Sequence, residues 1–187
     1  VEFGVGLIPG GGGSKEFALR ASDDFSDGNI DEQVLRDYFL TIGMAKVSTS
    51  AHEAFGLHIL KQGRDQVVLN PSRRIAEAKR AAISLAEASY TRPVQRRDIK
   101  VLGRSGLGMF YAGANAMASG NYISEHDRLI SKKLAWVLCG GDLSAATPVT
   151  EQYLLDLERE AFLSLCGERK TLERIQSILT GGKPLRN

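Results

Sequence analysis

Apolar residues recur every three or four positions through most of this 187-residue chain, and this spacing limits the folds open to it. It places apolar side chains on one face of an α-helix, whereas a half-buried strand needs alternation at every second residue. The clearest stripe contains Val34, Leu35, Tyr38, Phe39 and Ile42. Helices are predicted over residues 15–21, 30–45, 50–56, 71–89, 106–120, 124–139, 150–166 and 172–179, with 106–120 as a buried helix.

Capping residues support several of these helices. Ser14 stands where an N-cap is expected, and Asn70 precedes Pro71, a residue favoured at the first helical position because its missing N–H would be unpaired there. Ser124 and Asp127 have the spacing of a capping box. These signals fix where three of the predicted helices begin.

Strand signals are few. One short strand is predicted over Leu57–Leu60, and no other alternating stretch is prominent. The predicted fold class is therefore mostly α with one or two short strands, which is too few strands for a complete α/β domain. No internal repeat or long linker divides residues 1–187, so we expect a single domain. The apolar run at the first residues reads as the middle of a structured element, and we expect the chain to begin inside a larger protein.

The composition excludes several classes of function. Twenty-four basic and 22 acidic residues are interspersed, which leaves no basic footprint for nucleic acid. No run of about 18 apolar residues predicts a membrane span, and no leader is recognisable, so a cytoplasmic protein is expected. Neither cysteine has a metal-ligand spacing and no histidine stands beside a cysteine or carboxylate at one, so no metal site is predicted.

The glycine run near the start of the chain, Gly10–Gly13, invites a phosphate-binding interpretation, because backbone N–H groups at a helix start attract anions. The spacing of these glycines does not fit a known nucleotide-binding loop. A Walker loop needs a lysine directly after its last glycine, but here lysine arrives only at Lys15. A dinucleotide fingerprint from Gly4 would need a third glycine where Pro9 stands. A nucleotide-binding role stays as a minor hypothesis.

The opening run does resemble a known motif. A glutamate, Glu2, is followed by Phe-Gly-Val-Gly-Leu and then by Ile8-Pro9-Gly10. This order and spacing are similar to the active-site element of the crotonase, or enoyl-CoA hydratase/isomerase, family. Looser matches are Ser50–Leu57, similar to the family's Ala-x-x-Ala-x-x-Gly-Leu element, and the end of the chain, where Gly182-Lys183-Pro184 resembles a closing segment of the family.

The resemblance implies both a fold and a chemistry. The chain would be the C-terminal helical portion of a crotonase-type α/β domain, with Glu2 as a catalytic acid or base in the hydration of a 2-enoyl-CoA. Pro9, Gly10 and Gly11 would form the wall against which the acyl thioester lies, and Lys183 would reach a phosphate of CoA. Without the resemblance, Glu2 and Lys183 would be interpreted as solvated surface charges and the glycines as a tight turn.

Residues 99–150 exceed an ordinary hydratase and form an added helical segment. With the stretches at Gly120–Asp127 and Val149–Leu163, they resemble a branch of bacterial fatty-acid oxidation proteins. In that branch an NAD-binding 3-hydroxyacyl-CoA dehydrogenase precedes the hydratase. The resemblance therefore implies NAD for the upstream dehydrogenase domain and no cofactor in this chain. The implied partners are an acyl-CoA thioester and the upstream domains of the same polypeptide, with a homo-oligomer left open.

Two hypotheses about function follow. In the first, the chain is part of a β-oxidation enzyme and is inactive alone, because the second glutamate and the oxyanion donors lie upstream. In the second, the chain is a helical docking or oligomerisation module in which residues 99–150 grip another domain or subunit. The acyl chain length and the choice between hydratase and isomerase stay open.

Overall fold

The computed structural model describes residues 2–26 and 28–187, and within them helices dominate. The packing falls into two parts, one made of residues 1–47 and 96–187 and the other of residues 48–95. Each part is described by itself. The prediction of a mostly helical chain with one or two short strands is confirmed, and the prediction of one domain over residues 1–187 stays a prediction.

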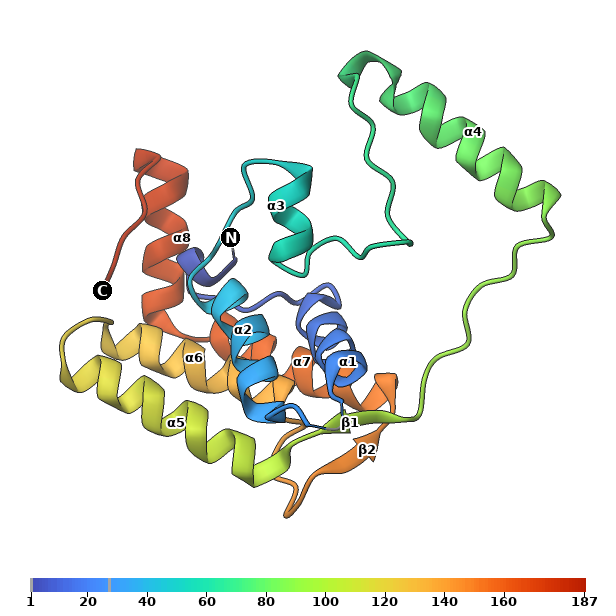
Figure 1. Ribbon diagram of the computed structural model, residues 1–187. Helices are drawn as coiled ribbons and strands as arrows, with labels where there is room; N and C mark the ends of the chain where they lie inside the picture. Colours follow the sequence, from blue (N-terminus) through green and yellow to red (C-terminus); the bar gives the residue numbers. More distant parts are fainter. Residues whose placement is uncertain (1, 27) are drawn as a thin grey trace. The chain divides into compact units, whose positions relative to one another are not determined.

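The larger part contains most of the secondary structure (Figure 1). In chain order its elements are the 3-10 helix η1 (Glu2–Val5), α1 (Gly13–Asp24), α2 (Asp31–Gly43), β1 (Ile99–Val101), α5 (Gly103–Ser119), α6 (Glu125–Leu138), β2 (Thr147–Val149), α7 (Glu151–Cys166) and α8 (Arg169–Gly181).

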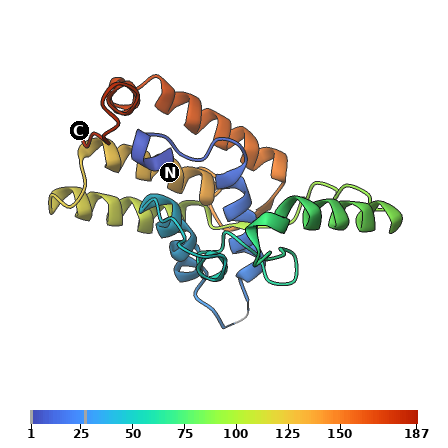
Figure 2. The ribbon, with the colours of Figure 1, turned by 90° about the horizontal axis from the view of Figure 1, so that it is seen from above.

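Helix α6 is the centre of the larger part. It lies between α5 and α7 (Figure 2) and also contacts α1 and α2. Eight of its 14 residues are buried, among them Ile130, Leu134 and Val137. The predicted capping box is confirmed: Ser124 accepts from the N–H of Asp127 and the carboxylate of Asp127 accepts from the N–H of Ser124. A helix buried on nearly every side holds its neighbours in place.

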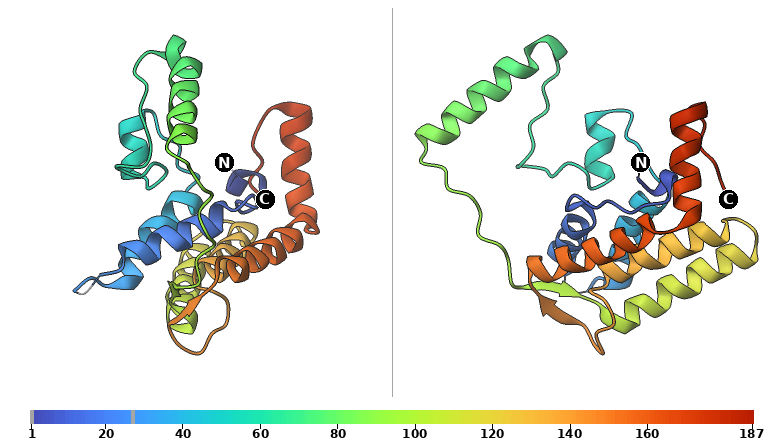
Figure 3. Two further views of the ribbon diagram at one scale, coloured as in Figure 1. Left: turned by 90° about the vertical axis from the view of Figure 1, so that its right-hand side faces the viewer. Right: turned by 180° about the vertical axis from the view of Figure 1, so that it is seen from behind.

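The other helices of this part are amphipathic. Helix α5 confirms the predicted helix near residues 106–120 but buries only one face, including Leu107 and Phe110, so the prediction of a buried helix is wrong. Its Gly, Ala and Ser residues on the opposite face are exposed. Helix α8 lies beside η1 (Figure 3), which brings the beginning and the end of the described chain into contact.

The two strands pair antiparallel, with Ile99 opposite Val149 and Val101 opposite Thr147. This sheet was not predicted, and the strand predicted over Leu57–Leu60 is wrong. Those residues close the end of α3 (Ala51–Gly56), because the amides of Ile59 and Leu60 both donate to the carbonyl of Ala54. An amide used in this way is not available to a strand partner.

The smaller part contains α3 (Ala51–Gly56), η2 (Pro71–Arg73) and α4 (Arg74–Glu87). Asn70 caps η2 as predicted, since the side chain of Asn70 accepts from the N–H of Ser72 and Pro71 stands at the first helical position. Helix α4 buries none of its residues. Among the described residues no helix is long and apolar enough to cross a membrane.

Candidate functional site

The segment from Glu2 to Gly13 crosses the larger part and is anchored by its apolar residues. Phe3 and Ile8 are buried, and Ile8 is fully inaccessible to solvent. Between them the chain makes a turn in which the amide of Gly6 donates to the carbonyl of Phe3 and that of Leu7 donates to the carbonyl of Glu2. These contacts fix the backbone on which the candidate catalytic residue stands.

Glu2 is the first residue of η1 and is exposed. Its backbone is held by the hydrogen bond from Leu7, 3.0 Å in length. The residue after it, Phe3, belongs to the hydrophobic core. A carboxylate in this position is accessible to water and to a ligand, while its main chain is tied to the folded protein.

A buried hydrogen-bond chain holds the middle of the segment. The hydroxyl of Thr171, on α8, donates to the carbonyl of Gly6 at 2.9 Å. Since this uses the only proton of the Thr171 hydroxyl, Nε2 of His126 donates to the hydroxyl oxygen of Thr171, also at 2.9 Å. Burial, with a further contribution from the nearby charge of Arg174, lowers the pKa of His126 below its usual range. The three residues connect the segment to α6 and α8.

The glycine turn packs tightly against α7. A Cβ atom on Gly10 would lie less than 3.0 Å from three ring carbons of Phe162, so only glycine fits there without a shift of the ring. Gly12 has a φ of +94°, a conformation that favours glycine. The hydroxyl of Ser14 donates to the carbonyl of Pro9 at 2.9 Å. Gly11, by contrast, is exposed and has open space where a side chain would be.

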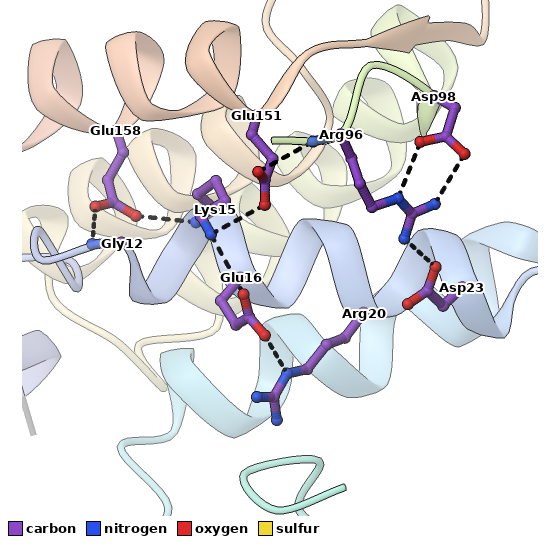
Figure 4. A network of polar contacts seen from close by, with 9 residues as sticks. All are labelled: Gly12, Lys15, Glu16, Arg20, Asp23, Arg96, Asp98, Glu151 and Glu158. Carbon is purple, nitrogen blue, oxygen red and sulfur yellow. Dashed lines mark hydrogen bonds and ion pairs between the residues drawn. The ribbon is translucent and has the colours of Figure 1, made fainter. Parts of the chain in front are cut away.

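Glu158 of α7 fastens this turn to the rest of the protein (Figure 4). It is 1% exposed, and its two carboxylate oxygens accept from the amide of Gly12 at 2.6 Å and from the amide of Lys15 at 2.9 Å. The carboxylate thereby caps the N-terminus of α1, where helix N–H groups lack partners and the helix dipole favours a negative charge. The predicted cap at Ser14 is wrong, because the helix begins at Gly13 and takes its acceptor from another helix.

Further ion pairs lie along α1, next to the contact between Glu158 and the glycine turn (Figure 4). The ammonium group of Lys15 lies 3.3 Å from Glu16 and 3.5 Å from Glu151, and Glu16 also pairs with Arg20 at 2.9 Å. Glu151 in turn accepts from the amide of Arg96. The side chains of this network are mostly half-buried, and the network joins α1 to the start of α7.

Lys183 lies on the C-terminal tail and is exposed. Its carbonyl accepts from the hydroxyl of Ser177 at 2.9 Å. Farther along, Asn187 accepts from Arg174 at 2.9 Å, and Arg174 forms a buried ion pair with Asp127 at 2.8 Å. Burial alone would raise the pKa of Asp127, but hydrogen bonds from Arg174 and Ser124 outweigh it and lower that pKa. The tail is thus held near α6 and α8.

The predicted site residues fall into separate places on this framework. Phe3 and Gly4, directly after Glu2, line one pocket together with Pro184, the residue after Lys183. Pro9, Gly10 and Gly11 do not line that pocket, and Gly10 packs against Phe162 of α7 instead. Their roles toward a ligand stay predictions.

Sequence reasoning missed Glu158 and Thr171. A signal existed for Glu158, which stands on the apolar stripe of its helix, between Leu154 and Ala161. A carboxylate on a buried face needs a partner. No comparable signal marks Thr171, because a threonine is tolerated on either face of a helix.

The turn between β1 and α5 does not fit a dinucleotide. Gly103 follows β1 and opens α5, as in a phosphate-binding turn, but β1 pairs antiparallel and not in a parallel unit. The amides of Gly103 and Arg104 already donate to the carbonyls of Cys139 and Leu143. They are therefore occupied where a pyrophosphate would need them. Within residues 2–26 and 28–187, no cluster of three His, Cys, Asp or Glu could hold a metal ion.

One curated protein is clearly similar to this chain. It is named "Probable 3-hydroxyacyl-CoA dehydrogenase", from Bacillus subtilis (strain 168), and is 46% identical over all 187 residues. The chain spans 23% of the length of this relative. No family model matches the chain, and no solved structure matches it either.

Proposed function

We propose that the chain is part of a fatty-acid oxidation enzyme with 3-hydroxyacyl-CoA dehydrogenase activity, and that it forms the C-terminal portion of an enoyl-CoA hydratase domain of that enzyme. The observation that carries the first half is the 46% identity to a probable 3-hydroxyacyl-CoA dehydrogenase along the whole chain. The second half rests on Glu2 and its spacing to Ile8-Pro9-Gly10.

Glu2 is the catalytic residue of this proposal. Hydration adds a hydroxyl from water to the β carbon of the enoyl thioester and a proton to the α carbon, so a carboxyl group must take up one proton while another is delivered. Glu2 is exposed on a turn whose backbone is hydrogen-bonded, which supports this role because water can reach the carboxylate while the main chain is held in place. The second carboxyl group and the oxyanion donors would come from a preceding portion of the polypeptide.

Pro9, Gly10 and Gly11 would form the wall for the thioester. The fixed turn supports this, since Glu158 and Phe162 hold its two sides and Gly11 leaves open space above the backbone. Lys183 is an exposed cation that would meet a CoA phosphate. The turn at Gly103 does not fit a dinucleotide, so in this proposal NAD would bind elsewhere in the whole enzyme and this chain would take no part in hydride transfer.

The test is Glu2→Gln in the full-length polypeptide, with hydration of a 2-enoyl-CoA and oxidation of a 3-hydroxyacyl-CoA measured side by side. We expect hydration to fall about 10²- to 10⁴-fold, the usual loss for a general acid–base group, while dehydrogenation is retained. Glu160→Gln, which changes an exposed carboxylate on α7, is the control and should leave both rates unchanged. Unchanged hydration in Glu2→Gln, or equal loss of both activities, would overturn the role of Glu2.

A helical docking module remains the alternative. It predicts that Glu2→Gln leaves hydration intact while substitutions on the exposed face of α5 weaken assembly of the enzyme. The exposed large apolar side chains near the end of α5, Met117 and Tyr122, favour a contact at that place.

A further inference from the structure

An apolar pocket of about 560 Å³ lies between η1, α2, α5 and the C-terminal tail. Its volume is typical of small-molecule sites, which hold roughly 300–1,000 Å³. Aromatic rings form one wall, where Phe39 and Phe110 stack with ring centroids 4.6 Å apart. All three methionines of the chain, Met44, Met109 and Met117, line the pocket. Methionine side chains adapt to flexible apolar ligands better than branched ones do.

The charges on the lining are unbalanced. The charged side chains that line the pocket are three arginines and one carboxylate, namely Arg36, Arg174, Arg186 and Asp127. Arg174 and Asp127 neutralise each other in their buried ion pair. Arg36 and Arg186 are exposed, and in the described part of the chain neither side chain has an ion-pair or hydrogen-bond partner. Two unpaired guanidinium groups therefore border an apolar pocket.

The pocket is long. Its lining extends along α2 from Gln33 to Gly43 and along α5 from Met109 to Met117. At a rise of 1.5 Å per residue these stretches measure about 15 Å and about 12 Å. Such a length fits an extended aliphatic chain better than a compact ring system.

We infer that this pocket binds a long aliphatic chain that ends in an anionic group, with the chain along α2 and α5 and the anion at Arg36 and Arg186. This site differs from the proposed thioester site, since Glu2 and Pro9–Gly11 do not line it. The inference therefore does not rest on the proposed function. A free long-chain fatty acid has the required chemistry, whereas the acyl thioester of CoA belongs to the proposed site around Glu2.

Binding is tested by isothermal titration of the 187-residue chain with dodecanoate, below its micellar concentration. Octanoate should bind at least tenfold more weakly, because each buried methylene contributes about 0.8 kcal/mol, or roughly fourfold in affinity. Uncharged dodecanol should bind about two- to fivefold more weakly, as expected for an exposed charge pair. Tighter binding of dodecanoate than of dodecanoyl-CoA would support the free acid as the ligand, whereas the reverse would assign the pocket to the thioester substrate and overturn the inference.

Two matched glycines of α5 locate the ligand. Gly113 lines the pocket and Gly108 does not, yet both have open space where a side chain would be. Gly113→Trp should fill the pocket and weaken dodecanoate binding at least tenfold, whereas Gly108→Trp should bind like the unchanged chain. Neither should harm folding, because glycine is the poorer residue in an exposed helix.

The anion site is tested by Arg36→Gln and Arg186→Gln. Each should weaken dodecanoate about two- to fivefold and leave dodecanol unchanged. Arg97→Gln, at an exposed arginine away from the pocket, is the control. The inference is overturned by absence of saturable dodecanoate binding, by equal binding in both tryptophan variants, by dodecanol binding as tightly as dodecanoate, or by dodecanoyl-CoA binding more tightly than dodecanoate. Glu2→Gln should not alter dodecanoate binding, so a failure here is separate from a failure of the proposed hydratase role.

Discussion

Replacement of Glu158 by glutamine tests how the glycine turn is held. The carboxylate is 1% exposed and accepts two backbone hydrogen bonds, at 2.6 and 2.9 Å. Glutamine keeps one carbonyl acceptor but turns an NH₂ group toward the second amide. One charge-assisted bond is lost and one half-buried N–H is left without an acceptor, which costs about 1.5–3 kcal/mol. In a domain of about 150–250 residues, 1 kcal/mol corresponds to roughly 2–4 °C, so the melting temperature should fall by about 3–12 °C.

The assay is calorimetric melting together with urea unfolding. Glu160→Gln is the matched control, because it makes the same chemical change two residues farther along α7 at an exposed position. It should change the stability by less than about 0.5 kcal/mol. If the two variants melt within 1–2 °C of each other, roughly the effect of 0.5 kcal/mol, the carboxylate of Glu158 does not hold the turn and the reasoning is refuted.

Three further predictions concern burial. The pKa of His126 is lowered in the folded chain, so the stability that neutral His126 contributes is complete above about pH 6.5 and is lost as the pH falls below that value. The free energy of unfolding in urea should therefore decrease between pH 7.5 and 5. His126→Gln should make this free energy less dependent on pH. Burial raises the pKa of Cys139 to about 12, so at pH 8 iodoacetamide should label the half-buried Cys166 first and Cys139 only on unfolding, as read by mass spectrometry. Gly10→Ala should destabilise by about 1–3 kcal/mol through overpacking, whereas Gly11→Ala should be nearly neutral in the same melts; equal effects would contradict the packing described.

Local signals predicted the helices well because their causes lie within a few residues of one another. The capping box of Ser124 and Asp127 and the Asn70–Pro71 start are both confirmed. The prediction at Ser14 failed for the opposite reason: the acceptor that caps α1 belongs to a residue more than 140 positions away. Nothing in the neighbouring sequence distinguishes a serine that caps a helix N-terminus from one whose hydroxyl donates to a preceding carbonyl, as Ser14 does to Pro9.

The sheet could not be predicted because each strand is three residues long and is defined only by its partner. Val101 pairs with Thr147, and the segment of the chain between them contains α5 and α6. Of the candidate site, the sequence predicted the turn and its residues, whereas the side chains that hold it, Glu158 and Thr171, become visible only in the folded chain.

The long separation between Gly12 and Glu158 also has a consequence for synthesis. Gly12 leaves the ribosome 146 residues before the carboxylate that fastens it. At a translation rate of about 5–20 residues per second, Glu158 is synthesised roughly 7–30 s after Gly12. Thr171, which holds Gly6, arrives later still. The segment from Glu2 to Gly13 is therefore held by residues that are translated more than 140 positions later, so a chain released before α7 would carry Glu2 on an unfastened segment and would be open to proteolysis.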